Sequence, residues 1–451
     1  MKVKCCLQAF DEKIIPLMQE ENRLSSQYSK LIVSAEIEFK GKIYNLSQMQ
    51  PFMLNKEQDE RKKATQAYLS FFEKNEDELD RIYDQLVQVR TQMAQKLGYD
   101  NYIPLGYLRM NRLDYTSDMV AMFRKQVQEE IVPIASKLYQ RQAKRLGLET
   151  LTCFDEKFEF ASGNPVPKCS FDKMISIANI MYHELSSETG SFFDTMVKMN
   201  LLDLVSKPKK RAGGYCTSLP EYKVPFIFSN FNGTSADVDV LTHEAGHAFQ
   251  IYMSKDIELQ ECLMATEESC EIHSMSMEFF AWPWMPLFFK EDTEKYYYLH
   301  LSDSIKFIPY GVLVDHFQHE VYAYPEMSAA ERKSTWHHLE KMYLPHKNYE
   351  DAPLLERGGW WYRQNHIFNN PFYYIDYTLA QLCALQFWER KHHDDPTCWH
   401  DYVELCKQGG KYPFLDLVQL AGLKSPFKKG TVHTVMMNIE AYLHSIDDTQ
   451  L

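Results

Sequence analysis

The chain has 451 residues, of which 45% are hydrophobic, so it is long enough for two or three domains or for one large helical body. Its formal net charge of −13 argues against nucleic acid or an anionic membrane as a partner. The ten cysteines form no C-x-x-C pair, and no apolar run approaches the roughly 18 residues of a membrane span. These features predict a soluble, cytoplasmic protein with reduced thiols.

The first half of the chain reads as helices that follow a short hairpin. Residues 37–44 alternate apolar and polar on either side of a glycine, which predicts the hairpin. Residues 75–98 read as a helix that Asn75 can cap. Residues 116–147 read as a second helix, which Pro133 should kink, and residues 187–204 read as a third.

The second half contains a short β-like stretch within helical sequence. Residues 213–218 and 224–228 are β-like, and residues 266–280 are helical again. Several further helices follow, broken by prolines, which are Pro283, Pro286, Pro309, Pro325 and Pro345. The predicted fold class is therefore mostly α, with a small β element.

The most informative motif is H-E-x-x-H, at His243, Glu244 and His247, within a predicted helix. Residues four apart lie on one helix face, so the two imidazoles can bind the same metal ion. Catalytic zinc takes three protein ligands and leaves its fourth position to water. Glu244, one position on, can reach that water rather than the metal.

A third ligand is needed, and two sources are known for such motifs. A histidine six residues past His247 is absent, because Met253 stands there, which excludes the metzincin pattern. A carboxylate on the following helix is the other source. Glu271 is the preferred candidate and Glu268 the alternative; with Glu271 as ligand, Glu268 is expected to orient a ligand histidine.

Several stretches together resemble one known family. They are Asn230–His247, Glu271–Met275, His366 and Pro371–Tyr377. In combination they strongly resemble the thimet oligopeptidase and oligoendopeptidase F family, and the oligoendopeptidase F branch most closely. The resemblance covers nearly the whole chain.

The resemblance implies a zinc endopeptidase with a helical body around a deep substrate cleft, which cuts short unstructured peptides. It implies one zinc ion per chain, with His243, His247 and Glu271 as ligands and Glu244 as general base. The small sheet would lie next to the zinc-binding helix. Substrate-cleft residues implied by resemblance are Gly213, Gly214, Tyr215 and Cys216.

The resemblance also points to residues near the C-terminal end that close on the scissile peptide, namely His366, Tyr374 and Tyr377. Tyr374 and Tyr377 are three apart, so on a helix they can direct two phenols at one point. A phenol or imidazolium donor at the carbonyl oxygen typically lowers the barrier by about 3 kcal/mol. Tyr373 is expected only as a substrate contact.

The chain departs from the family at its start, since relatives carry further helices before the hairpin. The expected organisation is an incomplete N-terminal lobe over residues 1–110 and a catalytic domain over residues 111–451. The cleft is then expected to be more open, and folding could depend on a partner or on dimerisation. Alternatives that stay open are a metallo-carboxypeptidase, a catalytically silent peptide-binding relative, and cobalt or manganese in place of zinc.

Overall fold

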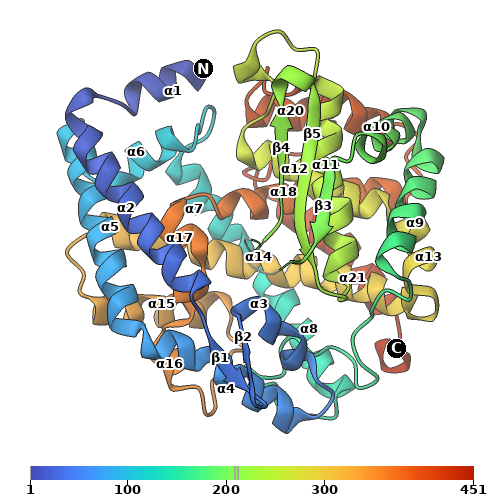
Figure 1. Cartoon of the computed structure of the whole chain (residues 1–451), viewed down its shortest axis with the longest axis horizontal. Helices are drawn as coiled ribbons and strands as arrows, with labels where there is room; N and C mark the ends of the chain where they lie inside the picture. The colour runs from blue at the N-terminus through green and yellow to red at the C-terminus, as the bar shows by residue number, and fades with distance from the viewer. Residues whose placement is uncertain (1, 208–209, 211–212) are drawn as a thin grey trace. The chain divides into compact units, whose positions relative to one another are not determined.

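The computed structural model of the chain describes residues 2–207, 210 and 213–451 (Figure 1). Most of these residues are helical, and the strands are few and short. The mostly α fold class is therefore confirmed, while the deep cleft stays a prediction. Among the described residues, none of the helices combines the length and the apolar character that crossing a membrane requires.

Contacts between Cα atoms divide the chain into two compact units, each assembled from two stretches of sequence. The first unit is Met1–Asn164 with Ile305–Ile375, and the second is Pro165–Ser304 with Asp376–Leu451. The long helix α14 (Thr293–Ala323) carries the chain from the second unit into the first. The division at residue 110 stays a prediction.

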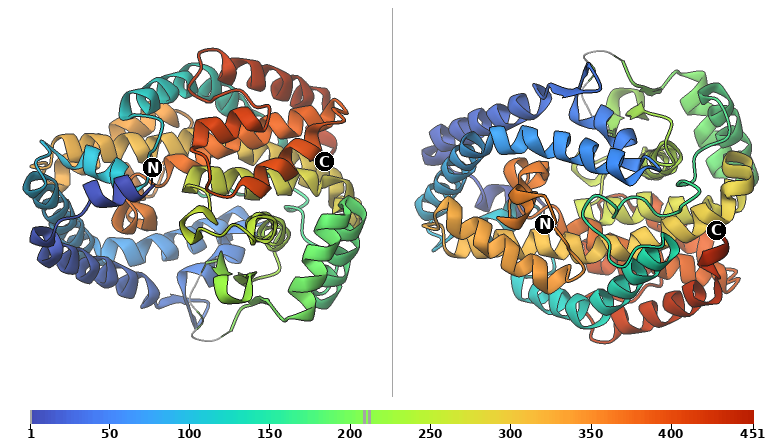
Figure 2. Two further views of the ribbon diagram at one scale, coloured as in Figure 1. Left: turned by 90° about the horizontal axis from the view of Figure 1, so that it is seen from above. Right: turned by 90° about the horizontal axis from the view of Figure 1, so that it is seen from below.

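The first unit packs helices around an aromatic core. Its elements are α1 (Lys2–Gln8), α2 (Ile15–Val33), β1 (Ile37–Phe39), β2 (Lys42–Tyr44), α3 (Leu46–Met49), α4 (Gln58–Lys74), α5 (Glu76–Lys96), α6 (Tyr102–Arg109), α7 (Ser117–Gln126), α8 (Val132–Arg145), the later part of α14, α15 (Ala329–Tyr343), α16 (Pro353–Glu356) and α17 (Asn365–Asn369). Helices α2 and α5 lie side by side (Figures 1 and 2). The rings of Tyr83, Trp361 and Phe368 meet with centroids 4.7 to 5.6 Å apart.

One carboxyl group in this core is buried without a complete set of partners. Glu340 on α15 is 1% exposed, and no hydrogen bond of normal geometry reaches either of its carboxylate oxygens, although Tyr349 and Trp336 lie near them. Burial is the largest influence on this group and raises the pKa of Glu340 to about 7, against the opposing effects of Lys347, Tyr349 and Trp336. The folded protein therefore holds a proton on Glu340 at pH values where the unfolded chain has lost it.

Replacing Glu340 with glutamine is expected to flatten the pH dependence of stability. The raised pKa stabilises the folded protein below about pH 4.5, and this contribution is lost as the pH rises through about 7. A change of the pKa from 4.5 to about 7 corresponds to roughly 3 kcal/mol, of which about 2.5 kcal/mol is lost between pH 5 and pH 8. In urea unfolding, the free energy of unfolding of the wild type should fall by this amount between pH 5 and pH 8, relative to that of Glu340→Gln. Equal pH slopes for the two proteins would contradict a buried neutral carboxyl.

The second unit contains the three-stranded sheet and the helices around it. Its elements are α9 (Phe171–Leu185), α10 (Ser187–Lys198), β3 (Leu202–Val205), β4 (Tyr215–Leu219), β5 (Val224–Phe231), α11 (Ala236–Ser254), α12 (Glu267–Phe280), α13 (Met285–Phe289), the start of α14, α18 (Ile375–His392, from Asp376 onward), α19 (Cys398–Gln408), α20 (Phe414–Leu420) and α21 (Thr431–Ser445). Helices α9 and α10 pack against each other (Figure 2). Helix α11 lies between the sheet and helices α12 and α19.

The sheet has the strand order β3-β5-β4. Strand β3 is parallel to β5, and β4 is antiparallel to it, with Tyr215 opposite Phe228 and Cys216 opposite Ile227. Among the described residues, β4 pairs with β5 alone, so its other edge carries backbone groups that no strand occupies. The two predicted strands before the H-E-x-x-H helix are therefore confirmed.

Several predicted boundaries are confirmed and two are wrong. The hairpin, the helix of residues 75–98 and the helix of residues 266–280 are present. The predicted helix of residues 187–204 ends at Lys198, because Leu204 is instead buried in strand β3. Pro309 does not break α14, because fully buried neighbours such as Ile308 and Val312 hold the helix across the missing hydrogen bond.

Two local predictions differ from what the structure shows. In place of the predicted kink at Pro133, the structure has a π-helical turn at Val127–Ile131, after which α8 begins with the proline in its first turn. Asn75 does not cap α5 through its side chain, which instead donates to the carbonyl of Phe71 at the end of α4.

All ten cysteines lie in the described part, and none forms a disulfide.

Candidate active site

Helix α11 presents the H-E-x-x-H residues from a firmly held N-terminus. The Asp237 carboxylate accepts the backbone N–H groups of Asn232 and Gly233 in the turn that leads from β5 into the helix. His243 and His247 follow one turn apart, with ring centroids separated by 5.0 Å. Their side chains therefore leave the same face of the helix, as the spacing predicts.

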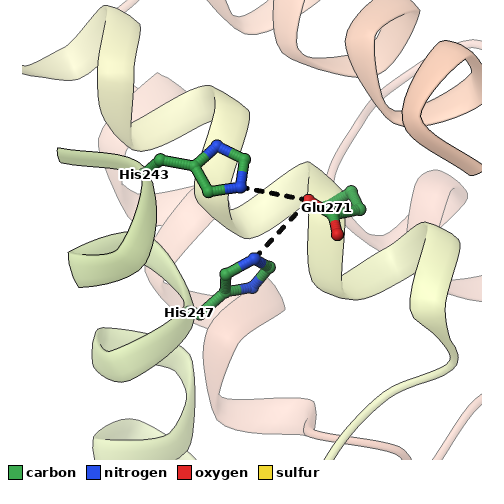
Figure 3. Close-up of side chains that lie close together, drawn as sticks. All are labelled: His243, His247 and Glu271. Atoms are coloured by element: carbon green, nitrogen blue, oxygen red, sulfur yellow. Dashed lines mark ion pairs between the residues drawn. The ribbon is translucent and has the colours of Figure 1, made fainter. Parts of the chain in front are cut away.

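Helix α12 brings Glu271 to the same point. The Nε2 atom of His243 lies 3.3 Å from Glu271 Oε2, and the Nε2 atom of His247 lies 3.5 Å from it. Figure 3 shows both imidazoles turned toward this carboxylate oxygen. Ligand bonds of 2.0–2.1 Å in a tetrahedral site place donor atoms about 3.4 Å apart, so the three side chains fit a zinc ion.

The close approach of the two helices depends on Gly246, which lies between the two histidines. A Cβ atom added at Gly246 would lie 2.6 Å from the carbonyl oxygen of His273 and 2.6 Å from Cα of Ser274. Any larger residue would therefore collide with the backbone of α12. The glycine within the motif thus sets the distance between the histidine helix and the helix that carries Glu271.

Glu271 is buried and held in place by its own helix. It is 4% exposed, and the hydroxyl of Ser274 donates to Oε2 at 3.0 Å. Burial disfavours the charged carboxylate, but His247 and His243 outweigh it and keep the pKa of Glu271 well below its usual value. A carboxylate ionised in this way is the form that binds a metal ion.

A second carboxylate contacts the other nitrogen of a ligand histidine. Oε1 of Glu278 lies 2.7 Å from Nδ1 of His243, and its Oε2 lies 2.7 Å from Nε2 of His300. Glu278 lies two turns beyond Glu271 on α12, but the sequence alone gives it no role. Glu268, predicted to orient a ligand histidine, accepts a hydrogen bond from the Thr266 hydroxyl, and its wider role stays a prediction.

Glu244 lies beside the three candidate ligands without joining them. It is 7% exposed, and its Oε2 atom has no hydrogen-bond partner. The pKa of Glu244 is raised, mainly because burial disfavours the charged carboxylate. A Cβ atom at Gly214 would lie 3.3 Å from Oε1 of Glu244, so the chain leading into β4 passes directly next to this carboxylate.

The predicted substrate strand therefore begins at the candidate active site. The Gly213 carbonyl accepts a hydrogen bond from the Asn230 side chain at 2.9 Å, which ties this end of the strand to β5. Tyr215 is 46% exposed and stacks on Phe228. Burial, with a smaller contribution from Glu244, raises the pKa of the Cys216 thiol well above its usual value. Cys216 is therefore a neutral thiol in this environment.

The other predicted residues fall in two groups. His366, Tyr373 and Tyr374 lie together in the first unit, where the His366 ring stacks on Tyr373 at 5.3 Å and meets Tyr374 at 5.1 Å. Tyr374 comes just before α18, and Tyr377 lies in its first turn within the second unit. Burial raises the pKa of Tyr374, so its phenol keeps its proton. Their action on a substrate stays a prediction.

Comparison with known proteins finds matches among peptidases. The sequence profile of peptidase family M3 matches residues 52–437. An oligoendopeptidase F homolog from Borreliella burgdorferi is 24% identical, over 96% of this chain and 75% of its own.

Solved structures are similar over the whole chain. The structure of PZ peptidase A with an inhibitor is 53% identical, with a TM-score of 0.97 over 99% of this chain and 80% of that one. A proposed oligoendopeptidase F from Bacillus anthracis is also 53% identical, with a TM-score of 0.92 over 100% of this chain and 78% of that one. The chain therefore belongs to peptidase family M3, within which it is a member of the oligoendopeptidase F branch.

Proposed function

We propose that this metallopeptidase is a zinc-dependent endopeptidase that hydrolyses internal bonds of short, unstructured peptides. The observation that carries the proposal is the convergence of two imidazole nitrogens and one buried carboxylate, with Glu244 beside them. Nitrogen and carboxylate donors in this number suit a zinc site that keeps a position open for water. His243, His247 and Glu271 would hold the ion.

The residues divide the chemistry between them. Zinc, when bound, supplies Lewis acidity to a water and to the substrate carbonyl. Glu244 takes the proton of the attacking water and delivers it to the leaving amine. Its unpaired Oε2 atom and its position outside the ligand set support this role.

The edge of β4 would hold the substrate as an added strand. An extended peptide can pair with the unoccupied edge through backbone hydrogen bonds, independently of its side chains. Gly213, Gly214, Tyr215 and Cys216 would contact the residues nearest the scissile bond, because Gly214 lies next to Glu244. An unfolded segment has its backbone N–H and C=O groups free for this pairing, which supports short unstructured peptides as substrates.

The remaining proposed donors come from the stretch of sequence that includes His366 and Tyr377. Tyr377, with Tyr374 or His366, would donate hydrogen bonds to the oxyanion that forms at the scissile carbonyl, and Tyr373 would contact the substrate. Each such donor typically contributes about 3 kcal/mol to the stability of the transition state. Tyr374 is suited to donation because burial keeps its phenol protonated.

Incubation with a mixed peptide library tests the proposal. Mass spectrometry should detect cleavage at internal bonds, and an excess of chelator should abolish it, with recovery after zinc is added back. Peptides blocked at the C-terminus should still be cut. Loss of cleavage for blocked peptides would indicate a carboxypeptidase, and cleavage that persists in chelator would contradict metal dependence.

A further inference from the structure

A line of hydrogen bonds runs from the candidate ligand His243 away from the metal position. His243 Nδ1 meets Glu278 Oε1 at 2.7 Å, and Glu278 Oε2 meets His300 Nε2 at 2.7 Å. The indole N–H of Trp282 donates to His300 Nδ1 at 2.9 Å. All four residues belong to the second unit, and they come from α11, α12, the turn after α12, and α14.

The indole fixes the direction of the two bonds nearest to it in this line, and the third follows because an ionised carboxylate can only accept. An indole nitrogen can only donate, so Nδ1 of His300 carries a lone pair and the proton of the ring lies on Nε2. His300 therefore donates to Glu278. Glu278 accepts from it on one oxygen and from His243 Nδ1–H on the other. This arrangement leaves a lone pair on His243 Nε2, which is the atom facing Glu271 and His247.

The packing around His300 holds its ring in one orientation. The ring is parallel to Tyr296, at an interplanar angle of 9° and a centroid distance of 5.5 Å, and it contacts Phe279 at 4.9 Å. The His300 side chain is 9% exposed and that of Glu278 is 15% exposed. Tyr297 in turn donates to the carbonyl of Trp282 at 2.8 Å, which anchors the residue that ends the line.

We propose that His300 is a positioning residue for the metal ligand His243, acting through Glu278, with Trp282 setting its tautomer. His300 orients the carboxylate, and the carboxylate orients the imidazole and keeps its Nε2 atom free to bind the metal. This inference rests on the metal site of the proposed function. Loss of such outer contacts typically weakens metal binding by about tenfold to a hundredfold.

Zinc affinity of the full chain, measured by competition with a chromogenic chelator, tests the proposal. His300→Phe keeps a ring against Tyr296 but removes both hydrogen bonds, so we expect zinc to bind about tenfold more weakly. His300→Gln places an amide N–H where Nε2–H lay, so it should restore most of the affinity. His183→Phe, which removes an exposed contact between His183 on α9 and Asp194 on α10, should bind zinc as wild type does.

A double-mutant cycle tests the route through Glu278. If His300 acts through this carboxylate, adding His300→Phe to Glu278→Gln should weaken zinc binding no further. Full additivity, or wild-type affinity in His300→Phe, would overturn the proposal. If His300→Phe fails to fold, Trp282→Phe is the second variant. It should bind zinc several fold more weakly, and wild-type affinity in this variant would likewise overturn the proposal. A wild-type protein that binds no zinc would overturn the proposed function itself.

Discussion

Replacing Glu244 with glutamine is expected to reduce peptide hydrolysis by about 10³-fold or more while zinc stays bound. The carboxylate lies beside the candidate ligands but outside their set, so its loss removes the proton acceptor and leaves the metal donors intact. General acid–base catalysis by one positioned group typically contributes about 10²–10⁴-fold. Turnover of a quenched fluorescent peptide and the zinc content after dialysis are the two measurements.

The exposed Glu129 offers a matched control for this substitution. Its carboxylate is 59% exposed and lies on the π-helical turn of the first unit, so Glu129→Gln should keep wild-type turnover. Loss of zinc from Glu244→Gln would mean that this carboxylate helps to hold the metal. Wild-type turnover in Glu244→Gln would contradict the assignment of Glu244 as the general base.

The local pattern of the sequence predicts most elements, because their signals lie within one or two turns of the chain. Helix α5 is acidic in its first turn and ends with Lys96, which complements the helix dipole. Strand β3 could not be predicted in the same way. Its four residues continue a helix-like pattern, and only pairing with β5, more than twenty residues later, makes them a strand.

The candidate site was predictable where spacing alone determines geometry. The positions of His243 and His247 follow from the helix period, and Glu271 follows from the need for a third ligand on the next helix. The contacts of Glu278 with His243 and His300 were not predictable. Each of these contacts depends on which faces of α11, α12 and α14 pack together. The spacing of the residues along the chain does not determine that packing.

Replacing Gly246 with alanine is expected to destabilise the protein by about 3 kcal/mol and to weaken zinc binding at least tenfold. The added methyl group would lie 2.6 Å from two backbone atoms of α12, and backbone cannot move aside as a flexible side chain can. Overpacking of this kind typically costs about 1–3 kcal/mol and occasionally more. Separation of the helices would also carry Glu271 away from His243 and His247.

The sign of the stability change distinguishes a collision with the backbone of α12 from the ordinary effect of helix propensity. In a helix interior, glycine to alanine normally stabilises by roughly 0.5–1 kcal/mol, so propensity alone predicts a higher melting temperature. Thermal unfolding of metal-free protein and chelator competition for zinc measure the two expected losses independently. A variant that is more stable than wild type and binds zinc equally well would show that the helices can shift. Gly246 would then not set the spacing of the metal ligands.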